Sequence, residues 1–396
     1  MSDESDEESE TLMKRYLKTA LSDQSEISLE DSNMYLAEDR ILCLGIHSLG
    51  YDLDYLPDAE STVDPVTSLT RLMGQRRRWI NGSWFAFNYV RSHSYERSNC
   101  KFLIQLLYYS LVQKLTWIAP SMFYIAMNLT LIAAVRQYVL PIFEAFFNAE
   151  NDYELYNYRI SIFSVKNVVE SIPAIINFLY IMVVFSVVLY SMLVNHNVKK
   201  FKSVYYMASS ILGFYGLIVM ILLIINTYTI IVDMINGEGS EDYIIPLVYL
   251  RGMILFILIG HGVPIIWTFS LKKYVEIITS LLSYLFFTPT YINILMVFAF
   301  CRIDDLSWGT KGLDADGANM VQREWERRKY IFVLQFITTN ILISYVFVRL
   351  SDFDMTRNIT ILFITILVSF LLLFRLIPAA IYLLKYKLKK IWAGNF

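Results

Sequence analysis

The chain has 396 residues, of which 56% are hydrophobic and 15% aromatic. Charged residues make up only 18%, against roughly a quarter in soluble domains, so the composition excludes a purely soluble enzyme and predicts an integral membrane protein with a soluble portion. The net charge of −2 says nothing about a nucleic-acid partner, and none is expected. The cysteines, Cys43, Cys100 and Cys301, show neither a disulfide framework nor zinc-type spacing.

Residues 1–30 form an acidic, serine-containing segment that we expect to be a disordered tail rather than a signal peptide. Residues 31–95 have the composition of a soluble domain. A helix is predicted to start at Glu38-Asp39-Arg40, which places two acids in its first turn. A short strand at 52–55, a loop at 58–65 and helical spacing over 69–89, broken near Asn81-Gly82, follow.

Residues 96–114 alternate basic and apolar side chains, which predicts an amphipathic helix lying in the membrane interface. Residues 115–396 then form the predicted membrane domain. A membrane-spanning helix needs about 20 apolar residues, and six segments meet this requirement: 115–135, 172–194, 205–232, 244–270, 330–349 and 359–384.

The distribution of Lys and Arg among the loops predicts the orientation of these spans. The loop at Lys199 and Lys200, the pair Lys272-Lys273 and the carboxyl-terminal tail are basic, whereas the loops 136–171 and 236–243 are acidic or lack basic residues. Both termini of this multi-pass protein are therefore predicted to be cytoplasmic, with a cytoplasmic loop over residues 301–329.

A further apolar stretch, residues 278–300, contains Pro289 near its middle. If this stretch crossed the membrane, the basic tail would lie outside, against the charge rule. We therefore predict a re-entrant element that turns at Pro289, although full crossing remains an alternative.

Asp39 is the first candidate for chemistry. A carboxylate at this place can take a proton from an acceptor hydroxyl as a general base. It can equally be an acid that only favours the positive end of the helix dipole. Glu38 and Arg40 beside it are secondary candidates.

The segment Gln75-Arg76-Arg77-Arg78-Trp79 is more specific. Three arginines alone are typical of a positive-inside flank. However, the Gln75 amide can bind sugar hydroxyls, the Arg78 fork matches phosphate oxygens, and the flat face of Trp79 can stack on a pyranose ring. The roles of Arg76 and Arg77, ligand or simple charge, stay open.

Ser307-Trp308-Gly309-Thr310-Lys311-Gly312 is the third cluster. Its two glycines allow close approach of the backbone to a ligand, and Lys311 supplies a compact charge for phosphate. The alternative is an ordinary turn at the membrane edge with Trp308 as an interfacial anchor.

These three clusters, in this order, resemble the chitin synthases. The run 33–42 around Glu38-Asp39-Arg40 and the run 75–83 are shared more loosely with cellulose and hyaluronan synthases. The cluster 307–312 and the preceding run 289–295 point to chitin synthases in particular. The resemblance extends from about residue 30 to the end of the chain.

The resemblance implies a mainly α polytopic membrane protein with a carboxyl-terminal remnant of an α/β GT-A-type glycosyltransferase domain over residues 31–95. It implies transfer of N-acetylglucosamine from UDP-N-acetylglucosamine to β-1,4-linked chitin, export of the polymer and the use of Mg²⁺. Asp39 would be the base; Gln75, Arg78 and Trp79 would hold the acceptor and the diphosphate; and Trp308 and Lys311, with Gly309 and Thr310 as secondary candidates, would close over the nucleotide.

In the chitin synthases a nucleotide-sugar domain with an Asp-x-Asp metal motif precedes the Glu-Asp-Arg helix, and the residues before Glu38 in this sequence contain no such motif. A loop of the Leu-Pro-Gly-Ala type is also missing. Asp3 and Asp6 lie in the acidic segment and do not replace the metal motif. We therefore expect the carboxyl-terminal part of a synthase, inactive alone, with UDP-N-acetylglucosamine, chitin oligomer and membrane lipids as partners and homo-oligomerisation open. Another processive polysaccharide synthase and a non-catalytic channel or regulatory partner remain alternatives.

Overall fold

The computed structural model describes residues 28–48, 53, 59, 61–93, 100–142, 145, 158–193, 201–236, 274–306, 319–350, 374, 377–386 and 388. All regular structure within these residues is helical, and they form no strand. Of the predicted strand 52–55 only Leu53 is described, and it belongs to no regular element. The α/β character implied for residues 31–95 therefore stays a prediction.

The chain divides into two compact units, each assembled from three segments. The first unit comprises Met1–Ser121, Phe178–Gly213 and Pro289–Leu342; the second comprises Met122–Asn177, Phe214–Thr288 and Ile343–Phe396. All three candidate clusters fall in the first unit.

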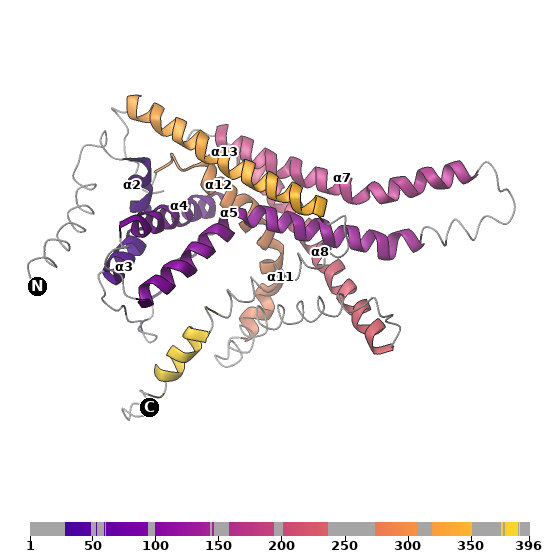
Figure 1. Cartoon of the computed structure of the whole chain (residues 1–396), viewed down its shortest axis with the longest axis horizontal. Coiled ribbons are helices and arrows are strands. Elements are labelled where there is room, and N and C mark those ends of the chain that lie inside the picture. The colour runs from indigo at the N-terminus through magenta and orange to yellow at the C-terminus, as the bar shows by residue number, and fades with distance from the viewer. Residues whose placement is uncertain are drawn as a thin grey trace, which may run out of the picture. The chain divides into compact units, whose positions relative to one another are not determined.

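In the first unit, α2 (Leu29–Met34), η2 (Tyr35–Ala37) and α3 (Glu38–Ser48) follow one another and pack against the long helix α4 (Leu69–His93) (Figure 1). The predicted helix start at Glu38 is confirmed by α3. The predicted break near Asn81 is wrong, because α4 runs through it without interruption. The Nδ2 of Asn81 donates a hydrogen bond to the Ala299 carbonyl at 2.8 Å, so this polar side chain is accommodated by a neighbouring element and does not end the helix.

Gly82 is required by the close approach of α4 to η2. A Cβ atom at Gly82 would lie 2.6 Å from the Ala37 Cβ and 2.8 Å from the Ala37 backbone nitrogen. Such distances are not tolerated, so glycine at this place brings the backbone directly before α3 against α4.

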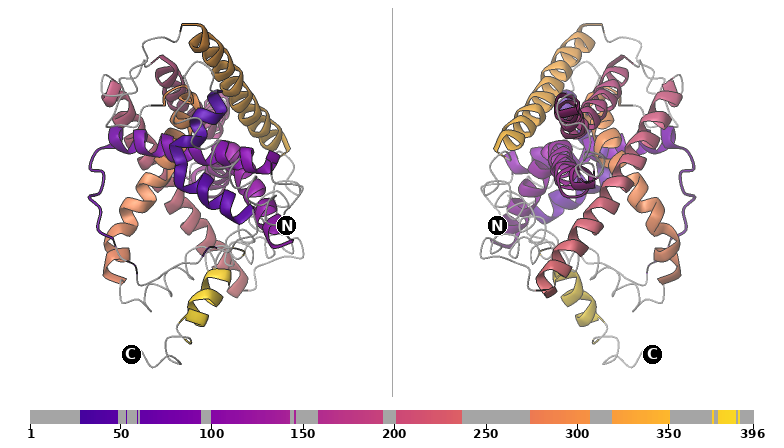
Figure 2. Two further views of the ribbon diagram at one scale, coloured as in Figure 1. Left: turned by 90° about the vertical axis from the view of Figure 1, so that its left-hand side faces the viewer. Right: turned by 90° about the vertical axis from the view of Figure 1, so that its right-hand side faces the viewer.

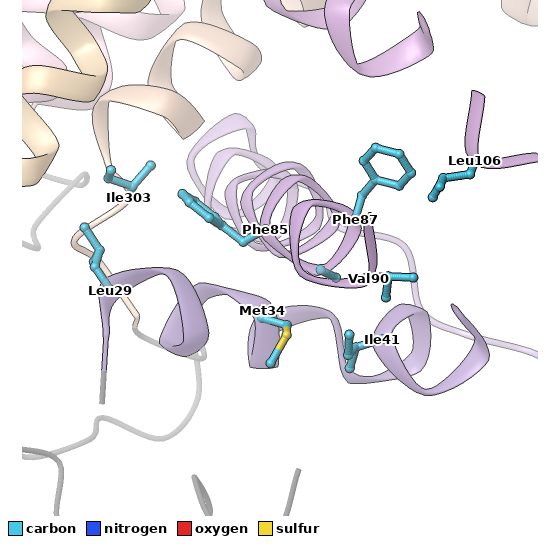
Figure 3. Packing of buried hydrophobic residues seen from close by; sticks show 9 residues of the cluster. Leu29, Met34, Ile41, Phe85, Phe87, Val90, Leu106 and Ile303 are labelled. Atoms are coloured by element: carbon cyan, nitrogen blue, oxygen red, sulfur yellow. The ribbon is translucent and has the colours of Figure 1, made fainter. Parts of the chain in front are cut away.

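Apolar side chains of α2, α3 and α4 form a common core with Leu106 and one residue of the 302–305 turn. Figure 3 shows Phe85 of α4 beside Leu29 and Ile303, and Val90 of α4 near Ile41 of α3. All five side chains are buried. Burial of large apolar side chains is the main contribution to holding these elements together.

Helix α5 (Cys100–Ala134) combines two elements that the sequence predicts separately. The expected interfacial helix 96–114 and the expected span 115–135 join without a break, and Leu103–Ile132 is long and apolar enough to cross a membrane. The Nε2 of Gln113 donates hydrogen bonds to the Trp84 carbonyl and to Oδ1 of Asn88. The polar side chain near the expected boundary is thus used for packing on α4.

An aromatic cluster joins α4 and α5 to α12 (Met296–Cys301) and α13 (Asn319–Leu350). Trp84 stacks on Trp117 with ring centroids 5.1 Å apart, and Phe300 lies within 5.3–5.8 Å of Trp84, Trp117 and Phe332. Offset-stacked and edge-to-face pairs of this kind add to the burial of the rings.

By length and composition, five helices of the described residues can cross a membrane: Leu103–Ile132, Asn167–Leu193, Lys202–Leu222, Ile278–Cys301 and Trp325–Arg349. They coincide with four of the six predicted spans and with the stretch 278–300. The predicted span 244–270 lies outside the described residues, and of the span 359–384 only a short apolar helix, Ile377–Tyr386, and residue 374 are described. The count of six spans stays a prediction.

The stretch 278–300 contains no turn at Pro289. Helix α11 (Tyr274–Thr290) continues through the π-helical segment η7 (Tyr291–Leu295) into α12. The Nδ2 of Asn293 donates to the Pro289 carbonyl at 3.1 Å, and its Oδ1 accepts from the Tyr180 hydroxyl at 2.7 Å. The wider helical turn and the Asn293 side chain together accommodate the proline, so the predicted turning point is wrong. The re-entrant element over residues 278–300 stays a prediction, with full crossing as its alternative.

The second unit includes parts of α5, α7 (Tyr158–Leu193), α8 (Lys202–Asn236) and α11. Met127, Leu131 and Val219 form its buried apolar cluster. Beside it, Asn177 donates a hydrogen bond to Asn128 and accepts one from the Tyr215 hydroxyl. α8 and α13 appear as long rods in both turned views (Figure 2).

We expect Gly82→Ala to lower the thermal stability of the detergent-solubilised protein, because the added methyl group must push α4 away from Ala37. Gly74→Ala in the same helix is the matched control, since nothing lies within 4 Å of its Cβ position. This control should stabilise the helix by about 0.5–1 kcal/mol. If both substitutions changed the unfolding temperature in the same direction, the close approach of α4 to Ala37 would be contradicted.

Candidate functional site

Helix α4 has a buried side and an exposed side in the region of the three arginines. Met73, Arg77 and Asn81 succeed one another at intervals of four residues and are all buried. With 3.6 residues per turn, Gln75 and Trp79 share the roughly opposite side, and Arg78 projects between the two sides. Arg77 therefore projects inward, whereas Arg78 lies nearer to Gln75 and Trp79.

Arg77 forms an ion pair with Asp305 that is almost inaccessible to solvent. Its Nη1 lies 2.8 Å from Oδ1 of Asp305, and the two side chains are 2% and 6% exposed. Burial lowers the pKa of Arg77, and the neighbouring Asp305 carboxylate opposes this shift. Arg77, a secondary candidate for substrate contact from the sequence, thus lies on the packed side of α4.

The ion pair continues into a chain of alternating charges. The second oxygen of Asp305 lies 3.4 Å from Nη2 of Arg302, and Nε of Arg302 lies 3.9 Å from Oδ1 of Asp304. The Nζ of Lys329, on α13, then donates a hydrogen bond of 2.8 Å to Oδ2 of Asp304. The network therefore links α4, the turn after α12, and α13.

Two buried asparagines hold the same turn through its backbone. Nδ2 of Asn33, on α2, donates to the Ile303 carbonyl at 2.7 Å, and Asn81 donates to the Ala299 carbonyl at 2.8 Å. The carboxyl-terminal end of α12 therefore has side-chain partners on both α2 and α4.

The exposed side of α4 carries the residues predicted to bind ligand. Gln75 and Arg78 are half-buried, and Trp79 is 43% exposed. The guanidinium carbon of Arg76 lies 4.5 Å from the ring centroid of Trp79, which is a cation–π contact. Arg76 therefore covers part of the indole, while a planar face next to an amide and a guanidinium remains suited to a sugar phosphate.

Asp39 and Arg40 lie at the start of α3, and both side chains are exposed. Glu38 is the first residue of α3. Because Ala37 touches Gly82, which follows Trp79 by about one helical turn, the start of α3 lies along α4 close to the exposed cluster. The structure therefore brings the first two candidate clusters to one pair of packed helices.

Trp308, Gly309, Thr310 and Lys311 lie outside the described residues. The description of this part of the chain ends at Leu306, directly after the Asp304-Asp305 pair. The predicted role of the third cluster stays a prediction, and the chain leading into it is attached to α4 by Asp305.

Within the described ranges, no group of three or more His, Cys, Asp or Glu side chains could hold a metal ion. The residues found there do not fit the Mg²⁺ that the resemblance implies.

Sequence reasoning missed the residues that contact Arg77 or hold the turn after α12. Among them are Asn33, Arg302, Asp304, Asp305 and Lys329. A signal was available, because Arg302, Asp304 and Asp305 form a charged run between the apolar stretch 291–301 and the cluster 307–312. Charged residues that directly follow a buried apolar helix require partners, and an unexplained arginine run is the obvious place to look for them.

A comparison with protein-family models matches residues 2–94 to a chitin synthase-like glycosyltransferase domain. The match contains the clusters around Asp39 and Gln75–Trp79. The match also includes residues 2–30, the acidic segment that is predicted to be a disordered tail.

Several curated fungal proteins are similar to the chain. It is 28% identical over 308 residues to Chitin synthase 3 of Verticillium dahliae, covering 73% of this chain and 31% of that protein. It is 28% identical to Chitin synthase A of Ampelomyces quisqualis over 304 residues, covering 72% and 29% of the two chains. For Chitin synthase 1 of Saccharomyces cerevisiae the identity is 27% over 304 residues, covering 72% and 24%. The aligned region thus spans about a quarter to a third of each relative.

We expect Arg77→Met to destabilise the protein by about 3–5 kcal/mol, the usual effect of breaking a buried ion pair. Arg76→Met removes a positive charge from the neighbouring position, where the contact with exposed Trp79 contributes about 0.5–1 kcal/mol. Thermal unfolding of both variants in one detergent is the measurement. Equal losses would contradict the assignment of Arg77 to the packed side.

Proposed function

We propose that this chitin synthase-like chain acts as the carboxyl-terminal part of a synthase that transfers N-acetylglucosamine from UDP-N-acetylglucosamine to the end of a growing β-1,4-linked chitin chain, which then crosses the membrane along its apolar helices. The observation that carries the proposal is the division of α4. Its packed side holds Arg77, and its exposed side presents Gln75, Arg78 and Trp79 beside the start of α3.

In the proposed reaction the acceptor hydroxyl oxygen forms a bond to the anomeric carbon of the donor sugar while the bond from that carbon to UDP breaks. Asp39 takes the proton of the hydroxyl, and UDP leaves with the bonding electrons. An exposed carboxylate suits this task, since it can receive the acceptor directly. A direct displacement of this kind inverts the configuration at the anomeric carbon.

Binding is assigned to α4. The Arg78 guanidinium pairs with oxygens of the diphosphate and stabilises the charge that develops on the leaving group. The Gln75 amide forms hydrogen bonds with sugar hydroxyls, and the terminal acceptor sugar stacks on Trp79. Glu38 and Arg40 adjust the charge around Asp39. Trp308 and Lys311 are proposed to contact the nucleotide, with Gly309 and Thr310 permitting the approach.

The family match and the names of the relatives support a chitin synthase-like glycosyltransferase. The donor and the export of the polymer are proposed from the resemblance of the sequence clusters. Five helices able to cross a membrane by length and composition are consistent with an integral membrane location. The plasma membrane, cytoplasmic termini, lipid contacts and self-association are proposed from the sequence arguments.

Incorporation of labelled sugar from UDP-N-acetylglucosamine into chitinase-sensitive polymer tests this function. Membranes containing the chain are assayed with Mg²⁺. In a parallel sample the chain is joined to the amino-terminal portion of a relative. This portion lies outside the region in which the relative is similar to the chain. Transfer in either sample supports the proposal, and labelled polymer that resists chitinase would indicate another polysaccharide. Absence of transfer in both favours a non-catalytic partner.

We expect Asp39→Asn to lower transfer by about 10²- to 10⁴-fold without loss of folded protein, because an amide cannot accept the proton of the acceptor. The control is Asp64→Asn, which makes the same change at an exposed residue outside the regular helices. Full activity of Asp39→Asn would remove the base from the mechanism.

Trp79→Ala should raise the concentration of N-acetylglucosamine oligosaccharide needed for half-maximal stimulation of transfer. Base–aromatic stacking in other sites contributes about 1–3 kcal/mol, so we expect an increase of roughly tenfold for a sugar ring. Trp79→Phe keeps a planar face and should recover most of the affinity. Equal effects of the two substitutions would argue against a stacking role.

A further inference from the structure

We propose that Asp305, Asp304 and Arg77 are positioning residues for the exposed face of α4. The buried network that they form with Arg302 and Lys329 fixes the rotation of α4 against α12 and α13. This fixes the direction in which Gln75, Arg78 and Trp79 point. The effect on catalysis rests on the proposed function. The effect on the rotation of α4 does not.

The argument begins with the cost of burying Arg77. A guanidinium removed from water is strongly unfavourable unless an anion compensates it. Asp305 lies 2.8 Å from it and is equally buried. A rotation of α4 about its axis would separate the two charges inside the protein, and the resulting penalty makes one rotation much more favourable than the others.

The second step is that Asp305 is itself held. It lies within 3.4 Å of Arg302, and the neighbouring Asp304 accepts a hydrogen bond of 2.8 Å from Lys329 on α13. Backbone carbonyls of the same turn accept from Asn33 and Asn81. An anion anchored from several elements can set the position of α4, whereas an anion on a free side chain could follow it.

The third step concerns direction. Arg77 projects from the side of α4 roughly opposite to Gln75 and Trp79. Fixing the inward side therefore fixes the outward side, although no residue of the network needs to touch a ligand. α12 belongs to the candidate span Ile278–Cys301 and Lys329 to the candidate span Trp325–Arg349. The proposed binding face is thus held by charge to elements that also form apolar helices.

The experiment replaces the charges in pairs. Arg77→Met combined with Asp305→Leu removes both ions and leaves apolar groups, a change that proteins often tolerate without loss of stability. Arg302, which also contacts Asp305, keeps Asp304 as its anionic partner. Glu30→Gln combined with Arg328→Gln is the matched control, because this pair is also 2.9 Å apart and joins α2 to α13 but is 49% and 45% exposed. Exposed pairs of this kind contribute little.

The position of Trp79 is read directly from the ¹⁹F resonance of 5-fluorotryptophan-labelled protein in detergent. The chain has seven tryptophans, and the resonance of Trp79 is assigned by its loss in Trp79→Phe. We expect the Arg77/Asp305 double variant to keep its unfolding temperature while the Trp79 resonance shifts or broadens. The Glu30/Arg328 control should leave the resonance unchanged. An unmoved resonance in the first variant, or equal movement in both, would overturn the proposal.

If the double variant does not fold, Arg77→Lys replaces it. Lysine keeps the charge but lacks the planar fork, so folding is retained, and the proposal again requires the Trp79 resonance to move. Where transfer is measurable, the folded double variant should be about 10- to 100-fold slower. If the double variant had the same transfer rate and the same unfolding temperature as the unsubstituted protein, Arg77 and Asp305 would be a purely structural pair. Absence of transfer by the unsubstituted chain, both alone and joined to the amino-terminal portion of a relative, contradicts the proposed function, and the resonance alone then decides the positioning role.

Discussion

The buried contact between the Arg77 guanidinium and the Asp305 carboxylate determines how the first unit is assembled. Its two partners are 228 positions apart in the sequence (305 − 77) and are both nearly inaccessible to solvent. Apolar packing alone tolerates sliding and rotation, because hydrophobic contacts have little directionality. A buried ion pair does not tolerate them, since small displacements leave charge without compensation. The core around Phe85 supplies the attraction between elements, and the ion pair selects their register.

The arginine run shows what sequence reasoning could and could not reach. The pattern Gln75 to Trp79 correctly drew attention to α4, and the helix start at Glu38 is confirmed. The different roles of the three arginines were not predictable from the sequence. Adjacent arginines have the same chemistry and differ only in the direction in which the helix projects their side chains. Arg77 acquires its role from Asp305, and Arg76 lies over Trp79. Contacts between such distant residues leave no periodic trace in a single sequence.

The two wrong helix breaks have a common physical reason. Glycine and proline weaken a helix locally, and the sequence rules treat them as ends. At Gly82 the weakening is outweighed by a close approach that only glycine permits. At Pro289 the wider π-helical turn and the Asn293 side chain absorb the disturbance. In both places tertiary contacts override local propensity, which is a weak preference compared with burial and hydrogen bonding. The same holds for α5, where Gln113 joins two stretches that differ only in amphipathicity.

A polymerising enzyme that exports its product must keep the acceptor end at a constant place relative to the exit path, because the acceptor is renewed at each addition. On the proposed function, the acceptor rests on Trp79. The aromatic cluster of Trp84, Trp117 and Phe300 packs the following turns of α4 against α5 and α12. The charge network holds the preceding turns against α12 and α13. Trp79 lies between these two attachments, one apolar and one ionic. A helix held on both sides of a stacking platform cannot tilt that platform away from the apolar helices without breaking one of the two attachments.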